Sequence, residues 1–431
     1  MTKDKIFLYT FCAYVIFITC SVVTHALPRL VLTFFPAIML GVAIITDPRK
    51  VFSNKAFLFA LLYIFMLAAI LFDHKVGGFG YGKGGWDTFS VDVGFTLPSI
   101  ACASLLVSDR NKRDFRIINW VLIACVVISL LYMLPVALYN RAFIRYLAVH
   151  YREGVGIDSN VASFVDGFWN YIMLHIIALA FPVFWGLTEY AKGKMKYVYM
   201  AMTVCVLYLV AISSIMTTII FVLGALMYLA YHKWKKYRVA GILLFAGLII
   251  LLILNIETVL DYMLEYFRGT DAEKKILDFQ DIVRGGENRH ATIDGRTAHH
   301  DIALQAFYDS PLWGREYYGG GGHSYLLNRM GSGGLFLTIP YVAMLWCLYK
   351  QWLVRIPKEF KVYFNVSWIG AVILLYNKGC FGLEGYLFMG CLIPSLCMSY
   401  SLLRKKSPAK PPKSMKPQTD ATPPTGASLN P

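Results

Sequence analysis

Charged residues are scarce in this sequence. Of its 431 residues, 16% are Asp, Glu, Lys or Arg and 57% are hydrophobic, whereas soluble domains contain about 25% charged residues. A chain of this length with so little charge cannot cover its surface with polar groups, which excludes a soluble protein, a disordered chain and a collagen. The mean hydropathy of +0.55 agrees. The composition therefore predicts a polytopic helical membrane protein.

The motifs of the common enzyme classes are also missing. The sequence contains no G-x-x-x-x-G-K-[ST], no H-E-x-x-H and no G-x-S-x-G, which mark nucleotide, zinc and serine-hydrolase sites. Nor is there a C-x-x-C, and the nine cysteines lie in or beside apolar runs, which argues against a disulfide framework. His299 and His300 are adjacent, and neighbouring helical side chains diverge by about 100°. We predict neither a metal site nor a cofactor.

Long apolar runs are what the sequence does have. A bilayer core needs about 20 apolar helical residues, and twelve runs approach that length. We therefore predict an all-α integral membrane protein with about twelve transmembrane helices, nine of them in 1–256 and three in 334–403. The runs are 6–26, 28–46, 57–72, 91–107, 117–139, 168–188, 197–213, 215–232, 239–256, 334–352, 362–377 and 383–403.

The distribution of basic residues predicts how these helices are oriented in the membrane. Alternate connections are short and basic, with clusters at Arg49–Lys55, Arg110–Arg116, Lys192–Lys196, Lys233–Arg238 and Lys350–Lys361. The positive-inside rule places these connections and both termini in the cytoplasm. The net charge of +15 thus reflects topology and attraction to anionic membrane lipids, and it does not indicate a nucleic-acid partner. The Pro-rich basic segment 404–431 is predicted to be a disordered cytoplasmic tail.

Three connections on the opposite side are long, namely 73–90, 140–167 and 257–333. The last joins the ninth and tenth predicted helices and holds 12 of the 26 acidic residues. The spacing of apolar residues over 257–284 predicts one or two amphipathic helices at the membrane interface, and 297–308 predicts another short helix. A channel or carrier rarely needs such a loop, whereas chemistry at the membrane surface can use one.

Candidate cations and a candidate general base occur in these outer connections. The candidate arginines are 141, 145, 152, 284, 289, 296, 315 and 329, and His323 follows four glycines. The planar guanidinium suits diphosphate oxygens, and histidine is a natural general base at neutral pH. The ordinary alternatives are arginines paired with loop acids, glycines that act only as a flexible connector, and a histidine that caps the tenth helix. Within the runs, His175 is the only clear ionisable residue, either functional or hydrogen-bonded in the core.

Two segments resemble the bacterial O-antigen polymerase and O-antigen ligase superfamily. In that family an arginine opens a short helix that ends in a Ser/His-Pro-Leu-x-Gly turn, as in 296–314 (RTAHHDIALQAFYDSPLWG), and a His-Ser-Tyr-Leu and a glycine pattern follow, as in 323–334. The segment 152–160 (REGVGIDSN) resembles a second family motif. A Ser/Thr-Arg pair that many ligases carry is replaced here by Ser213 to Thr218 without arginine, which favours a polymerase.

The resemblance implies a metal-independent glycosyltransferase of the bacterial inner membrane, with a periplasmic active site in 257–333. It would join oligosaccharide repeat units linked to undecaprenyl diphosphate. The first alternative is a ligase that transfers the glycan to lipid A-core, and the second is a transporter or flippase of lipid-linked glycans. The resemblance alone suggests a polysaccharide chain-length regulator as partner. The implied catalytic residues are His323 and Arg296. The implied diphosphate- and glycan-binding residues are Arg152, Arg145, Arg289, Arg315, Asn160, Tyr325 and Glu384.

Overall fold

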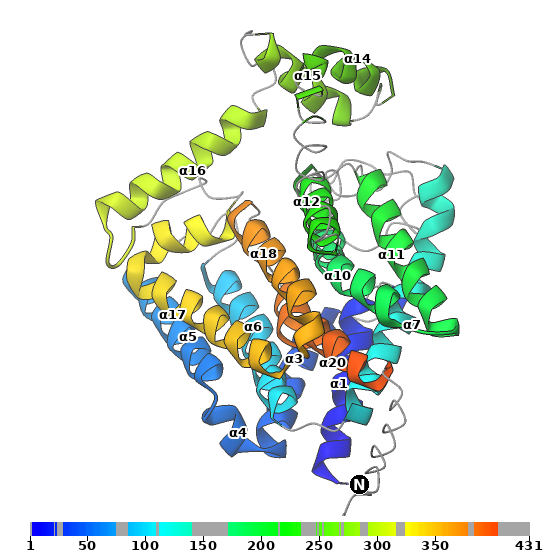
Figure 1. Ribbon diagram of the computed structural model, residues 1–431. Helices are drawn as coiled ribbons and strands as arrows, with labels where there is room; N and C mark the ends of the chain where they lie inside the picture. Colours follow the sequence, from blue (N-terminus) through cyan, green and yellow to red (C-terminus); the bar gives the residue numbers. More distant parts are fainter. Residues whose placement is uncertain are drawn as a thin grey trace, which may run out of the picture.

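The secondary structure is helical throughout the described part of the chain. The computed structural model describes residues 2–20, 22–23, 29–74, 85–108, 112–139, 171–213, 216–233, 247, 250–251, 254–266, 268, 271–284, 292–315, 324–377 and 383–403. Most helices form one bundle, while α14 and α15 lie apart from it at the top of Figure 1. The predicted loop 140–167, most of loop 73–90 and the tail 404–431 lie outside the described residues.

The bounds of the helices follow the chain from the blue to the red end in Figure 1. They are α1 (Lys3–Thr19), α3 (Arg29–Thr46), α4 (Pro48–Phe52), α5 (Lys55–His74), α6 (Gly85–Val107), α7 (Lys112–Tyr139), α10 (Tyr171–Tyr190), α11 (Lys194–Ser213), α12 (Met216–Lys233), α14 (Ile256–Tyr266), α15 (Asp271–Val283), α16 (Thr292–Asp309), α17 (Tyr325–Arg355), η2 (Lys358–Phe360), α18 (Lys361–Asn377), α19 (Leu383–Leu387), the π turn η3 (Phe388–Leu392) and α20 (Ile393–Leu403).

Every predicted apolar run except 239–256 coincides with a described helix, and most of that run lies outside the described residues. Helices suit such sequences because they satisfy their own backbone hydrogen bonds where water is absent. Among the described residues, four helices are long and apolar enough to cross a membrane: Lys55–Asp73, Arg113–Tyr132, Met173–Tyr190 and Tyr325–Arg355. The all-helical class is confirmed, and the number twelve stays a prediction.

The long predicted connection contains the helices expected from its apolar spacing. Helices α14 and α15 occupy 256–283 and α16 covers 292–309. The first two are joined by polar contacts: Gln280 Nε2 donates to Asp261 Oδ1 at 2.5 Å, and Arg284 lies 3.8 Å from Glu257 and 3.7 Å from Asp261. Arg284 is therefore an arginine that pairs with loop acids, as the ordinary alternative predicts.

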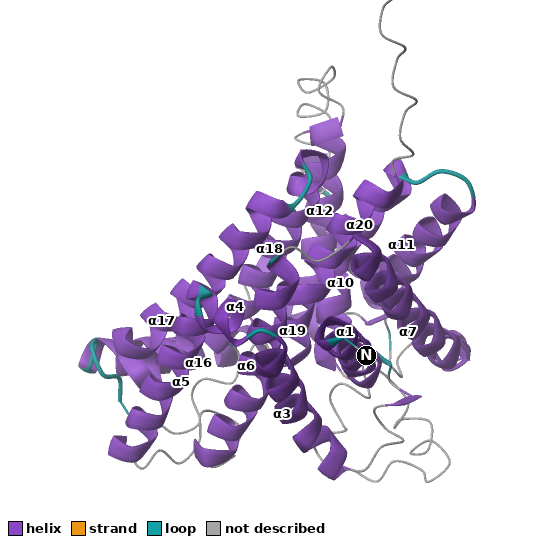
Figure 2. Ribbon diagram, turned by 90° about the horizontal axis from the view of Figure 1, so that it is seen from below, coloured by secondary structure: helices purple, strands orange, loops and turns teal. Residues whose placement is uncertain are grey.

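Large aromatic side chains fill the centre of the bundle. Trp352 is fully buried, and its indole N–H donates to the carbonyl of Gly390 at 2.8 Å. Gly390 lies in the π turn Phe388–Leu392, a wide turn that departs from the regular α-helical hydrogen-bond pattern. The contact holds the last predicted span against α17. Figure 2 shows the same bundle from below.

Helix α17 is longer than its predicted span and is broken near its start. The helix begins at Tyr325, nine residues before the predicted run 334–352. At Gly334 the backbone leaves the helical conformation, with φ 55° and ψ −153°. The part of α17 before the break therefore belongs to the segment that the sequence assigned to the long loop.

The turn that follows α16, Ser310–Gly314, fills this break. The N–H of Leu335 donates to the carbonyl of Pro311 at 2.8 Å, and the N–H of Phe336 donates to the carbonyl of Leu312 at 3.0 Å. A break in a helix interrupts its own hydrogen bonds, and buried backbone groups need other partners. The turn supplies those partners and so fixes the end of α16 against α17.

Two glycines permit the close approach of turn and helix. Gly314 has φ 79° and Gly334 has φ 55°, a region that residues with a Cβ rarely adopt. A Cβ at Gly334 would lie 2.5 Å from the carbonyl carbon of Leu312, and one at Gly314 would lie 2.3 Å from the nitrogen of Gly333. The two glycine-containing motifs thus form the two sides of one backbone contact.

We expect Gly334→Ala to destabilise the protein by more than about 2 kcal/mol, because a backbone at φ 55° and ψ −153° costs a residue with a Cβ about 1–3 kcal/mol and the Cβ also displaces the turn. The matched control is Gly224→Ala in α12, where a Cβ meets no atom within 4 Å and helix propensity favours alanine by about 1 kcal/mol. Denaturation of the purified protein in mixed micelles measures both. A Gly334→Ala variant as stable as the parent would contradict the contact.

Candidate functional site

An ion pair lies buried between α6 and α17. Asp92 Oδ2 and Arg329 Nη2 are 2.5 Å apart, and their side chains are 6% and 4% exposed. An isolated charge in this setting is costly, and a charge-paired, hydrogen-bonded one is tolerated. Ionisable residues within apolar helices usually mark functional regions of membrane proteins. The pair is therefore the natural starting point for a site.

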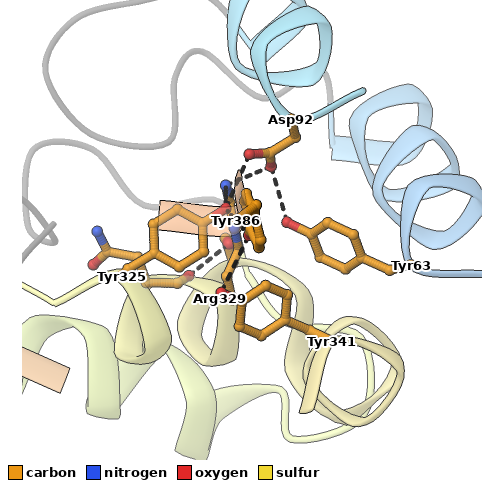
Figure 3. Close-up of polar contacts among 8 residues, drawn as sticks. Tyr63, Asp92, Tyr325, Arg329, Tyr341 and Tyr386 are labelled. Carbon is orange, nitrogen blue, oxygen red and sulfur yellow. Dashed lines mark hydrogen bonds and ion pairs between the residues drawn. The ribbon is translucent and has the colours of Figure 1, made fainter. Parts of the chain in front are cut away.

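Two tyrosine hydroxyls complete the hydrogen bonding of Asp92. Tyr63 of α5 donates to Oδ2 at 2.9 Å, and Tyr325 of α17 donates to Oδ1 at 2.9 Å. Arg329 Nη2 also donates to the Tyr325 oxygen at 3.0 Å, and its guanidinium lies 4.5 Å from the centre of that ring. Asp92 therefore accepts from three donors that converge on one carboxylate (Figure 3).

Tyr386 of α19 and Tyr341 of α17 extend the network. Tyr386 donates to the Tyr341 oxygen at 3.2 Å, and the oxygens of Tyr325 and Tyr386 are 3.3 Å apart. Both added tyrosines are fully buried. We call these six residues the Asp92–Arg329 cluster: Tyr63, Asp92, Tyr325, Arg329, Tyr341 and Tyr386. The cluster connects α5, α6, α17 and α19, which lie far apart in the sequence.

The cluster fixes the first turns of α17, directly after His323. Ser324 caps this helix, and its hydroxyl accepts the N–H of Leu327 at 3.1 Å. The N–H of Arg315 donates to the carbonyl of Gly331 at 2.9 Å. Arg315 and Ser324, the described residues on either side of 316–323, therefore both contact the first turns of α17. The indole of Trp313 adds a bond to Asp73 of α5 at 2.6 Å.

Two of the site residues predicted from the sequence have described side chains. Tyr325 belongs to the cluster, and its hydroxyl is engaged by Asp92 and Arg329. Arg315 forms an ion pair with Asp309, with Nη1 and Oδ2 2.6 Å apart and the arginine side chain 63% exposed. Arg315 is thus held by a loop acid, which lowers its standing as a diphosphate ligand.

The other predicted site residues are placed only in part. Arg296 lies near the start of α16 and Glu384 lies in α19, but their side chains are outside the described part. His323, Arg289, Arg152, Arg145 and Asn160 lie outside the described residues.

Sequence reasoning missed Asp92. The interpretation of His175 as the only clear ionisable residue within the runs is wrong, because Asp92 is the second residue of run 91–107 and is 4% exposed. The sequence feature that could have identified Asp92 is that it is the single acidic residue in that run. Arg329 follows Tyr325 by four residues, which places both on one helix face.

His175 itself is a hydrogen-bonded core residue. It is 3% exposed, and its Nδ1 shares a hydrogen bond with the hydroxyl of Thr218. The bond joins α10 to α12, close to the segment 213–218 that lacks the arginine of the ligases. The core interpretation of His175 is therefore the one that the structure supports.

The cluster is suited to holding helices in place. Its charges neutralise each other, and its members are at most 8% exposed, so a substrate has no direct access to the carboxylate. In the described part of the chain, no group of three or more His, Cys, Asp or Glu residues is arranged to hold a metal ion.

The chain was also compared with known proteins, and neither a protein-family model nor a curated protein matches it. The resemblance to the O-antigen superfamily therefore stands on the residues quoted for it.

We expect Asp92→Asn to destabilise the protein by about 3–5 kcal/mol, because it leaves the Arg329 charge buried without its counterion. The double variant Asp92→Asn, Arg329→Gln should recover at least half of that loss, since it removes both charges at similar volume. Lys50→Gln, which breaks the exposed Lys50–Asp47 pair (3.3 Å), should change stability by at most about 1 kcal/mol. Titration of unfolding in mixed micelles measures all three. Additive losses in the double variant would refute the pairing.

Proposed function

We propose that the chain is a membrane-embedded glycosyltransferase similar to the Wzy-type O-antigen polymerases. It would join oligosaccharide repeat units carried on a polyprenyl diphosphate at the periplasmic face of the bacterial inner membrane. The observation that carries the proposal is the contact between the turn Ser310–Gly314 and the break in α17 at Gly334. This contact gives a physical reason for the two glycine-containing motifs on which the resemblance rests.

The fixed start of α17 supports His323 as the general base in this proposal. A catalytic group must be held in position by its surroundings before the substrate arrives. His323 precedes Ser324, whose hydroxyl caps α17, and the first turns of α17 are fixed by the Asp92–Arg329 cluster. In this proposal Tyr325 is a positioning residue, because its hydroxyl is already engaged within the cluster.

The proposed reaction forms one bond and breaks one. His323 accepts the proton of the acceptor hydroxyl, whose oxygen attacks the anomeric carbon of the donor sugar. The bond from that carbon to the diphosphate oxygen breaks, and polyprenyl diphosphate leaves. Arg296 and Arg152 neutralise its developing charge, which fixed cations can do without a metal. Arg145 and Arg289 are further diphosphate candidates.

Sugar placement falls to the remaining predicted residues. Asn160 and Glu384 would hydrogen-bond the glycan in this proposal. Glu384 is favoured by its position, since α19 also supplies Tyr386 to the cluster and so lies beside the first turns of α17.

Two alternatives use the same features differently. A ligase would share the donor chemistry and transfer the finished glycan to lipid A-core, and the segment 213–218 without arginine favours the polymerase. A transporter or flippase would place charged residues along a path through the helices. Asp92 and Arg329 are buried charged residues of the described bundle, and they are paired and contacted by tyrosines, which favours an anchoring role.

We expect surface glycans of cells lacking this chain to show lipid A-core bearing a single repeat unit and no ladder on a gel. That pattern arises because a ligase still transfers unpolymerised units. Bare core with accumulated lipid-linked polymer would instead identify the chain as the ligase. An unchanged ladder would contradict both enzymatic assignments.

We expect His323→Ala and Arg296→Gln, each expressed in such cells, to leave the ladder absent although the variant inserts normally. Loss of one positioned general acid–base group typically slows a reaction by about 10²–10⁴-fold. The matched control for Arg296 is Arg284→Gln, because Arg284 pairs with α14 and is not expected to contact the donor. Glycan gels and membrane-fraction blots measure activity and insertion. A normal ladder with His323→Ala would remove the proposed base.

A further inference from the structure

A second polar site lies near the basic connections, away from the cluster. A cavity of about 140 Å³ is lined by residues of α7, α11 and α20: Arg116, Asn119, Trp120, Ile123, Met195, Tyr199 and Ser399. Its volume is well above the space that one water molecule needs. These residues lie near the start of α7, the start of α11 and the end of α20. Those helix ends face connections that the positive-inside rule assigns to the cytoplasm.

Asn119 lines this cavity and carries an acceptor without a partner. The side chain is 3% exposed, and its Nδ2 donates weakly to the carbonyl of Ser395 at 3.4 Å. Its Oδ1 is buried and has no hydrogen-bond partner among the described residues. Buried polar atoms nearly always have a partner. A ligand that enters the cavity and carries a hydroxyl or another donor would supply one.

Arg116 gives the same cavity a positive charge. It is exposed, one turn before Asn119 on α7, and in the part of the chain that the structure describes it has no ion-pair partner. Arg113, Lys192, Lys194 and Lys196, at or next to the starts of α7 and α11, are exposed as well. An anion is therefore the favoured ligand, and a phosphate group in particular suits the fork of guanidinium donors.

The remaining lining adds an apolar wall. Trp120 is 45% exposed and so faces the surroundings of the bundle, and Ile123 and Met195 continue the apolar surface. Amphipathic tryptophans are typical of the membrane interface. A ligand here would have a charged end in the cavity and an apolar end beside α7 and α11.

We propose that this cavity binds the headgroup of an anionic phospholipid of the cytoplasmic leaflet, of the phosphatidylglycerol type. The phosphate contacts Arg116, a headgroup hydroxyl donates to Asn119 Oδ1, and the acyl chains lie along Trp120. Both a negative phosphate and a hydrogen-bond donor are needed to match these two residues. The site is independent of the proposed glycosyl transfer.

The test titrates the purified full chain with phosphatidylglycerol and, separately, with phosphatidylmethanol, which is anionic but lacks the headgroup hydroxyls. Native mass spectrometry counts the bound lipid. We expect the parent chain to bind phosphatidylglycerol more tightly than phosphatidylmethanol. Arg116→Gln should bind both lipids about tenfold more weakly, because it loses one charge-assisted hydrogen bond. The matched control Arg113→Gln removes the same charge one turn away, outside the cavity lining, and should change binding less than twofold.

Asn119→Ala isolates the second contact. This variant should bind phosphatidylglycerol only as tightly as phosphatidylmethanol, and its affinity for phosphatidylmethanol should equal that of the parent chain. Equal losses for Arg113→Gln and Arg116→Gln would overturn the site in favour of general attraction between basic loops and anionic lipid. Equal binding of the two lipids by the parent chain would overturn the role of Asn119. Inorganic phosphate or glycerol 3-phosphate that binds without lipid, and displaces phosphatidylglycerol, would overturn the lipid source and indicate a soluble phosphate.

Discussion

The arrangement of the helices around the start of α17 depends on the ion pair between Asp92 and Arg329. Two opposite charges 2.5 Å apart in an apolar bundle cannot separate without leaving each charge unsolvated, so the pair fixes α6 against α17. The tyrosines then follow from the same requirement. A carboxylate has more acceptor sites than one guanidinium fills, and Tyr63 and Tyr325 occupy them from two helices.

The backbone contact at Gly334 meets the same requirement for main-chain groups, namely that buried polar atoms have partners. A break in an apolar helix exposes donors that water cannot reach, and the turn Ser310–Gly314 satisfies two of them. The side-chain cluster and the backbone contact lie on either side of the same half-helix, 325–333. That short helix is therefore held at both ends.

Much of this fold could be predicted from composition and spacing, because each helix is a local consequence of its own sequence. The described apolar runs of bilayer length form helices, and the segment 257–284, with its helical apolar spacing, contains α14 and α15. The cluster could not be predicted in this way, since Asp92 and Arg329 are 237 residues apart and no local pattern links them. Gly334 was part of a noted motif, yet the break in α17 arises only because a distant turn fills it.

The same distinction separates the candidate site into a frame and a reactive part. The frame consists of groups that satisfy one another: Asp92 with Arg329, Arg315 with Asp309, and Arg284 with the acids of α14. Groups already satisfied gain little from binding a substrate, because a new contact must first replace an existing one. In the proposed function, reactivity is therefore assigned to residues other than these pairs. The Asp92–Arg329 cluster is sealed within the bundle, so its part in the proposed function is to hold the first turns of α17 in place.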